Sequence, residues 1–250
     1  MKLMRSAISL FSYLLKFIVK RDEYSQFVLA EYISSRIYPK LKFSEFGRRW
    51  LEDSSFFEYY ESVMDKENWH SADRKFNLRN LMNLIKKDNE ANLIEFGAYK
   101  GASALLMCEW ANERNGSVYL LDSFKGLSEP GPKDGNYWQK SDLRATVEDV
   151  QKTLTHYSNF EIFPGYIPDS LKAIPEKVFD FAHFDLDLFQ PTLDSLNYIY
   201  PRMSKGGVLV FDDYGFLSCP GVTSAVDQFF VDKQENVVEI SSGQAFVVIL

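Results

Sequence analysis

The chain has 250 residues and a formal net charge of −7 at pH 7, with a hydrophobic fraction of 46% and an aromatic fraction of 16%. This composition is ample for a large core, and the length fits one α/β domain with a helical extension. The acidity argues against nucleic acid as a partner, because its phosphates select basic surfaces. The two cysteines, Cys108 and Cys219, form no metal or redox spacing. We therefore expect Cys108 to be a buried free thiol and the compartment to be the reducing cytoplasm.

Residues 1–90 are predicted to form a helical extension or lid, because their apolar residues recur at helical spacing and not in strand alternation. Within residues 1–20, Lys16 interrupts the apolar run that a secretory signal would need, and the segment is too short and charged to span a bilayer. This basic amphipathic segment either lies on a membrane surface or, as we favour, packs on its own domain or on a second subunit. The aromatic helices predict a homodimer, and residues 65–74 form either a substrate lid or a plain loop.

From residue 91 to residue 250 the pattern changes to strands that alternate with helices, as expected of one cofactor-binding domain. Strands are predicted over residues 92–97, 117–122, 159–163, 179–185, 207–212, 235–240 and 244–250. Helices are predicted between the first six strands, over residues 101–114, 142–156, 169–174, 190–203 and 221–232. Residues 241–243 leave room only for a hairpin, so the seventh strand must run antiparallel to its neighbour. This is the Rossmann-like arrangement of class I S-adenosylmethionine-dependent methyltransferases, whereas a dinucleotide dehydrogenase usually keeps its sheet parallel.

The first strand, turn and helix have the order that a nucleotide-binding α/β unit requires, with Gly97 and Gly101 in the turn. Alone this signal is weak. Glu95 lies near the end of a strand that should otherwise be buried, where a carboxylate must be paired or face a ligand. It could contact the methionine ammonium of a cofactor, directly or through water, or else lie at a strand end that faces solvent.

Two further strand ends offer groups for a nucleoside. Asp122 ends the second strand, where an acidic residue can accept hydrogen bonds from both ribose hydroxyls, or could instead cap a turn. Ser123 and Phe124, directly after Asp122, suit contacts with the sugar and the ring of a bound adenosine. Gly165 and Tyr166 follow the third strand, where the tyrosine either stacks on adenine or belongs to the core. The long loop over residues 123–141 begins at the same edge of the sheet, and loops of this length are usually functional or mobile.

Four carboxylates follow two neighbouring strands. Asp185 and Asp187 come at the end of the fourth strand, and Asp212 and Asp213 at the end of the fifth. Such a cluster repels itself unless it is compensated, and a hard divalent cation, Mg²⁺, is the simplest compensation. Strand alternation puts Asp185 and Asp187 on one face unless the chain turns between them, so one of the two either stands behind the ion ligands or caps the next helix. His183 is expected to be structural.

With these residues assembled, the chain resembles the macrocin O-methyltransferase family, metal-dependent sugar O-methyltransferases of antibiotic pathways, over about residues 50–250. The motifs that carry the resemblance are Glu95-Phe-Gly-Ala-Tyr-Lys-Gly-Ala-Ser103, Asp122-Ser-Phe-Lys-Gly-Leu127, Asp185-Leu-Asp-Leu-Phe-Gln-Pro-Thr192, Tyr200-Pro-Arg-Met-Ser-Lys-Gly-Gly207 and Asp212-Asp-Tyr-Gly215. The last three together are specific to the family. Phe189 departs from the family, where a tyrosine is common. The loss of the hydroxyl is expected to leave the chemistry intact and to alter the acceptor side.

The resemblance implies that S-adenosylmethionine is bound by the first two motifs, through Glu95, Gly97, Tyr99, Gly101, Ser103, Asp122, Ser123 and Phe124. Gly165 and Tyr166 are added as cofactor-binding candidates from their place after the third strand. Asp185, Asp212 and Asp213 would hold Mg²⁺, two adjacent hydroxyls of a glycoside acceptor would complete its shell, and Asp185 would also be the general base.

Three other readings of the same residues stay open. A catechol would chelate Mg²⁺ through adjacent phenolic oxygens, as the sugar diol does. A nucleotide-binding module without catalysis, docked through residues 1–50, would bind the cofactor with no metal requirement. A dehydrogenase is disfavoured by the reversed last strand and by the carboxylate cluster.

Overall fold

The computed structural model describes residues 10, 12–19, 23–40, 42, 47, 49–64, 71–86 and 90–250. The chain divides into two compact units, Met1–Phe57 and Glu58–Leu250. The first unit contains α2 (Glu23–Ile37) and the short 3-10 helix η2 (Arg49–Glu52), and α3 (Ser54–Val63) runs across the division. The membrane-surface prediction for residues 1–20 and the lid prediction for residues 65–74 fall largely outside the described residues. The described helices include none that combines the length and the apolar character needed to cross a bilayer.

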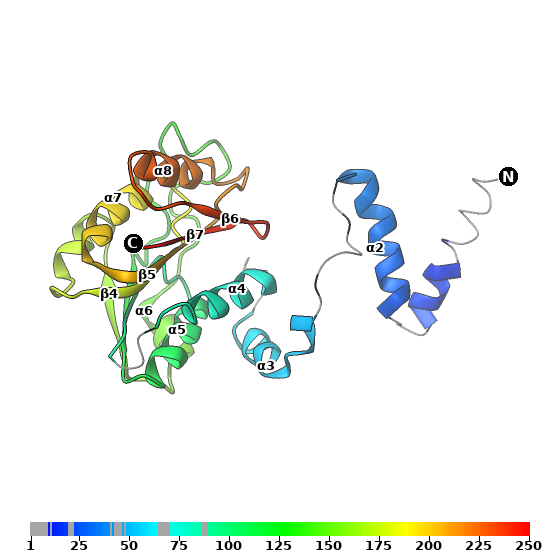
Figure 1. The fold of residues 1–250 in the computed structure, drawn as a ribbon, viewed down its shortest axis with the longest axis horizontal. Helices are drawn as coiled ribbons and strands as arrows, with labels where there is room; N and C mark the ends of the chain where they lie inside the picture. Colours follow the sequence, from blue (N-terminus) through cyan, green and yellow to red (C-terminus); the bar gives the residue numbers. More distant parts are fainter. Residues whose placement is uncertain are drawn as a thin grey trace. The chain divides into compact units, whose positions relative to one another are not determined.

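The second unit is built on a seven-stranded sheet with helices on both faces (Figure 1). Its strands are β1 (Asn92–Phe96), β2 (Ser117–Asp122), β3 (Phe160–Pro164), β4 (Phe179–Phe184), β5 (Met203–Asp212), β6 (Val238–Ile240) and β7 (Gln244–Val248). Its helices are α4 (Ala72–Met82), α5 (Ala102–Asn112), α6 (Val147–Thr153), η3 (Asp169–Ala173), α7 (Phe189–Ile199), η4 (Tyr200–Arg202) and α8 (Pro220–Phe230).

The strand order is β3-β2-β1-β4-β5-β7-β6, and β7 pairs antiparallel with both of its neighbours while the other pairs are parallel. The predicted reversal of the last strand is therefore confirmed, and its cause is the tight hairpin between β6 and β7. The order changes direction beside β1 and β4, so the carboxyl ends of these strands form the crevice at which ligands of such sheets bind.

The core lies in two layers, because successive strand residues point to opposite faces of the sheet. Leu93, Val118 and Val208 face the layer under α4, α5 and α6. Ile94, Leu209 and other residues of alternate parity face the layer under α7 and α8. Burial on both faces explains why the strands read as nearly continuous apolar runs, and it makes any charged residue inside them exceptional.

Most predicted elements form within a few residues of their expected bounds, and the differences have local causes. The helix predicted over residues 142–156 is shorter, because Thr146 and Asp149 form a capping box that starts α6 at Val147. The segment predicted as a helix over residues 169–174 is a 3-10 helix. β5 begins at Met203, earlier than expected, and its pairing with β4 shifts register between Phe179 and Phe181.

Candidate active site

A cavity opens at the carboxyl edge of the sheet. Six of the ten residues predicted to bind a cofactor line it, namely Gly97, Tyr99, Asp122, Ser123, Gly165 and Tyr166. Three aspartates line it as well, namely Asp185, Asp187 and Asp213. The structure thus brings the two predicted halves of the site, one for a nucleoside and one for a cation, into a single space.

The glycine turn forms the wall between these halves. Gly97 has φ 93°, and a Cβ placed on it would lie 1.8 Å from the carbonyl oxygen of Asp185. No other residue fits there, because the chain after β1 passes directly against the chain after β4. Gly101, with φ 86°, sits at the start of α5 and turns the backbone into that helix. Close packing of the backbone therefore requires glycine at position 97, and the left-handed φ favours glycine at position 101.

Asp122, at the end of β2, is held by backbone amides on both of its oxygens. Tyr99 donates its N–H to Oδ2 and Phe124 donates its N–H to Oδ1, each at 2.8 Å. Burial raises the pKa of this carboxyl to about 6, although both hydrogen bonds act to lower it. The carboxylate is fixed in position at the cavity wall, with acceptor capacity remaining on each oxygen.

The other four predicted cofactor residues do not line the cavity. Gly101 and Phe124 serve the backbone turns, and the Ser103 hydroxyl accepts a hydrogen bond from the buried Lys75 ammonium. Glu95 is 1% exposed, and its Oε1 lies 2.9 Å from Nδ1 of His183. Its Oε2 is buried without a hydrogen-bond partner among the described residues. The roles of these four residues toward a cofactor stay predictions.

Asp212 is turned into the protein, away from the cavity lining. Gln244 donates an amide N–H to its Oδ1 at 2.6 Å, and Nε2 of His183 lies 3.4 Å from the same oxygen. Burial alone would lower the pKa of His183, but Asp212 and Glu95 outweigh it and raise the pKa to about 10. The imidazole lies between the two carboxylates, and their charges favour its protonated form. This agrees with the expectation that His183 is structural.

Sequence reasoning missed the two adjacent cations that α4 supplies, Arg74 and Lys75. Arg74 Nη1 lies 2.8 Å from Oδ1 of Asp213 and 3.7 Å from Oδ2 of Asp212. Lys75 is 2% exposed and experiences the charges of Asp212, Asp185 and Glu95, which oppose the lowering of its pKa by burial. The protein itself thus compensates part of the negative charge, whereas the sequence alone predicts compensation by Mg²⁺.

One known protein family matches more than half of the chain. The family model described as Macrocin-O-methyltransferase (TylF) matches residues 70–241. The chain belongs to this family. The predicted family is therefore confirmed, and the match covers the sheet from β1 to β6 together with α4.

Two curated relatives illustrate the family. Demethyldecarbamoylnovobiocin O-methyltransferase of Streptomyces niveus is 28% identical over an alignment of 161 residues, and the match covers 58% of this chain and 60% of the relative. Mycinamicin III 3''-O-methyltransferase of Micromonospora griseorubida is 25% identical over 144 residues, 51% of this chain and 57% of the relative. The chain thus spans little more than half the length of these curated relatives.

Two solved structures show the same fold. The O-methyltransferase NovP superimposes with a TM-score of 0.61 and 24% identity, covering 73% of this chain and 83% of NovP. The calicheamicin methyltransferase CalS11 has a TM-score of 0.61 and 17% identity, with 79% and 92% covered. Together with the strand order, these likenesses confirm the class I methyltransferase fold.

In this macrocin O-methyltransferase family member, the long loop over residues 123–141 is anchored by a buried carboxylate. Asp134, 3% exposed, accepts the N–H of Phe189 at 2.6 Å and the N–H of Gly131 at 2.7 Å. It therefore caps α7, a role that the sequence offered to Asp185 or Asp187. Anchoring at Asp134 places Tyr137 and Trp138 at the cavity wall.

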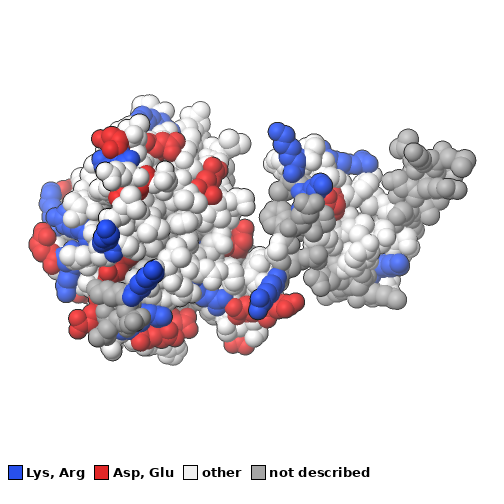
Figure 2. Space-filling model, viewed as in Figure 1, with Lys and Arg blue, Asp and Glu red and all other residues white. Residues whose placement is uncertain are grey.

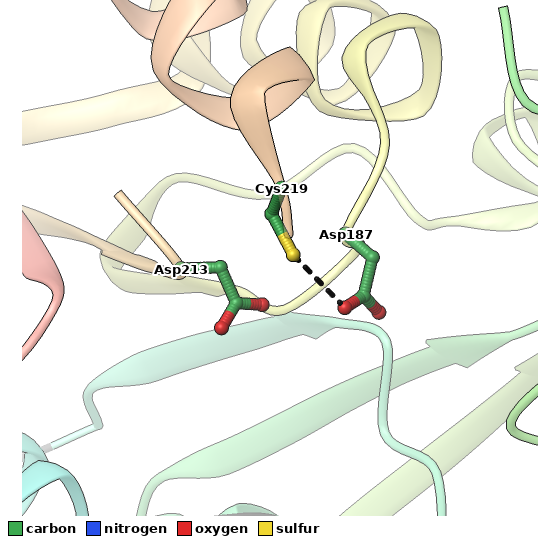
Figure 3. A group of neighbouring side chains, drawn as sticks. All are labelled: Asp187, Asp213 and Cys219. Atoms are coloured by element: carbon green, nitrogen blue, oxygen red, sulfur yellow. Dashed lines mark hydrogen bonds between the residues drawn. The ribbon is translucent and has the colours of Figure 1, made fainter. Parts of the chain in front are cut away.

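A second group that the sequence did not reveal lies on the acidic side of the cavity. Ligand atoms of Asp187, Asp213 and Cys219 all lie within 4.8 Å of one another (Figure 3). Burial, followed by the charges of Asp213 and Asp185, raises the pKa of Asp187 well above its ordinary value. Cys219 follows Asp213 by six residues, but the spacing belongs to no known metal motif, and only the turn after β5 brings the thiol back to the carboxylates.

Proposed function

We propose that this protein transfers a methyl group from S-adenosylmethionine to one hydroxyl of a vicinal diol, on a sugar of a glycosylated metabolite or polysaccharide, with the aid of Mg²⁺. The observation that carries the proposal is the single cavity with Gly97 and Asp122 at one side and Asp185 and Asp213 at the other. The activities of the two relatives, O-methyl transfer to demethyldecarbamoylnovobiocin and 3''-O-methyl transfer to mycinamicin III, support it.

The cofactor half would hold the nucleoside and the amino acid at separate points. Asp122 would accept hydrogen bonds from the ribose hydroxyls, since both of its oxygens are already oriented by backbone amides. Tyr166 would lie against the adenine. Oε2 of Glu95 is buried and has no hydrogen-bond partner in the described part of the chain, so it is an acceptor that suits the methionine ammonium, directly or through one water.

The acidic half fits a hard divalent cation. Its donors are carboxylate oxygens, and Arg74 and His183 offset only part of their charge. Asp185 and Asp213 would hold Mg²⁺ from the cavity wall, and the predicted third ligand, Asp212, would have to compete with its bonds to Gln244. When bound, Mg²⁺ supplies the Lewis acidity that makes a neighbouring sugar hydroxyl more acidic and fixes its position.

Proton acceptance, alignment of the reacting atoms and exclusion of water depend on the side chains of the protein. Asp185 would accept the proton of the acceptor hydroxyl as general base. Because the sulfonium methyl is already activated, the walls of the cavity mainly have to align oxygen, methyl carbon and sulfur. Tyr137 and Trp138 on the anchored loop would exclude water from this line.

Metal removal tests the proposal. Dialysis against EDTA should abolish methyl transfer to a diol sugar, and Mg²⁺ should restore it. Asp213→Asn should lower kcat/KM on the order of 100-fold or more, because it weakens both the cation site and the ion pair with Arg74. The control is Asp169→Asn, whose side chain is 83% exposed on η3 and which should act as wild type.

The outcomes separate the alternatives. Methyl transfer to catechols and not to diol sugars would mean that the acceptor is aromatic and not a sugar. Cofactor binding with no turnover on either acceptor class, insensitive to EDTA and to Asp213→Asn, would contradict the enzyme and leave a nucleotide-binding module.

A further inference from the structure

Two residues that the proposed function does not use face the same cavity. Asp187 is 7% exposed and Cys219 is 1% exposed, and both line the cavity beside Asp213. Asp187 comes from the turn after β4, and Cys219 immediately precedes α8. Figure 3 shows the Cys219 thiol and the Asp187 carboxylate pointing toward each other, with the Asp213 carboxylate alongside.

Asp187 is short of partners for a carboxylate buried to this degree. Within the described residues, its one hydrogen bond comes from the Cys219 thiol, with 3.6 Å between sulfur and Oδ1. A thiol is a weak donor, and a buried carboxylate normally has several strong ones. Arg74, the nearest guanidinium, is bonded to Asp213 instead.

The sulfur of Cys219 accepts a hydrogen bond, and the backbone of Cys219 lies at the start of a helix. Trp138 Nε1 lies 3.2 Å from Sγ, and Pro220 directly after Cys219 fixes the start of α8. A donor atom on a rigid element is what a binding site requires, because little ordering remains to be done when the ligand arrives. The thiol is therefore positioned toward Asp187 and Asp213 before any ion is present.

We propose that Cys219 and Asp187, together with Asp213, give the cation site a sulfur ligand, so that it binds borderline divalent ions such as Co²⁺ and Zn²⁺ more tightly than Mg²⁺. This inference rests on the proposed metal-dependent function and concerns which metal the site prefers. Carboxylate oxygens suit Mg²⁺, whereas thiolate sulfur selects softer ions. On coordination, the sulfur–metal bond forms and the thiol proton passes to the buffer.

The geometry needs only a small adjustment. The three ligand atoms lie within 4.8 Å of one another, and ligands of one tetrahedral ion are about 3.5 Å apart at ordinary metal–ligand bond lengths. A rotation of the Asp187 and Asp213 side chains toward the sulfur would close the difference, although the Asp213 rotation must loosen its bond to Arg74. Acceptor or water oxygens would fill the remaining positions.

Cobalt titration of the metal-stripped, full-length protein tests the inference. Wild type should bind Co²⁺ and develop the near-ultraviolet absorption band of sulfur-to-cobalt charge transfer. Cys219→Ser should lack the band and bind Co²⁺ at least about tenfold more weakly, while its affinity for Mg²⁺, measured by competition, should change little. The matched control is Cys108→Ser, because Cys108 is the other buried cysteine, lies in α5 and does not line the cavity. It should keep the band.

A second variant guards against misfolding of the first. Asp187→Asn keeps the size of the side chain and should weaken Co²⁺ binding by a similar factor, with the sulfur band still present at saturation. Cobalt binding without the band in wild type, or unchanged affinity in both variants, would overturn the sulfur ligand. If that happens while Mg²⁺ still restores methyl transfer after EDTA, only this inference fails. If no divalent ion binds or restores activity, the metal role in the proposed function fails with it.

Discussion

At the carboxyl end of β2, Asp122 combines two opposing influences on one carboxyl. Backbone amides of Tyr99 and Phe124 favour the charged form, and burial favours the neutral form strongly enough to raise the pKa to about 6. The raised pKa of the folded state means that this group contributes most stability to the ligand-free protein below its unfolded-state pKa. That contribution is lost as the pH rises through about 6. The ionised form of Asp122, which the proposed contact with the ribose hydroxyls uses, therefore costs stability near neutral pH.

Cofactor affinity should therefore depend on pH. We expect the Kd for S-adenosylhomocysteine, measured by isothermal titration calorimetry, to be constant above about pH 7 and to rise as the pH falls through about 6, because neutral Asp122 is a poorer acceptor for ribose hydroxyls. Asp122→Asn should bind weakly at every pH and lose this dependence. An unchanged pH profile in the variant would assign the effect to another group.

Among the connecting segments, the loop over residues 123–141 departs most from what its sequence suggests. Its length and composition are typical of a mobile lid, yet Asp134 holds it against the start of α7. Gly221 in α8 explains the close fit, because a Cβ there would lie 1.9 Å from Oδ1 of Asp134. The loop and the two helices on that face therefore form one packed assembly around the acidic side of the cavity.

Asp134→Ala should release this loop. The variant loses two hydrogen bonds to a carboxylate, each contributing about 1.5–3 kcal/mol, and uncaps α7. We expect faster amide hydrogen exchange over residues 128–141 and weaker cofactor binding, with the rest of the sheet still protected. Glu129→Ala is the control on the same loop, since its side chain is 76% exposed. Equal exchange in both variants would mean that Asp134 does not anchor the loop.

The elements were predictable from sequence and the long-range contacts were not. Alternating buried runs and one tight hairpin fixed the strands and the reversed β7, because those signals are local. Arg74 meets Asp213 across 139 residues of chain, and Asp134 meets Phe189 across 55. No local pattern marks such pairs. For the same reason the sequence counted four carboxylates as one cluster, whereas the structure turns Asp212 inward toward Gln244 and His183.

At the scale of the whole molecule, the family match and the cavity both belong to the unit Glu58–Leu250. The visible face of this unit mixes acidic and basic side chains (Figure 2). The unit Met1–Phe57 lies outside the match, and some of its large apolar side chains are exposed, Ile18 by 64% and Val19 by 74%. Self-association or membrane contact through that unit stays a prediction, as does the division of the chain at residue 90.

A crystal structure of the full chain with S-adenosylhomocysteine and Mn²⁺, using the anomalous signal of manganese, tests the central claim most directly. The account predicts one manganese peak bounded by Asp185 and Asp213, in the same cavity as a nucleoside whose ribose contacts Asp122. Bound S-adenosylhomocysteine with no manganese at this edge of the sheet, or with manganese bound elsewhere, would contradict it.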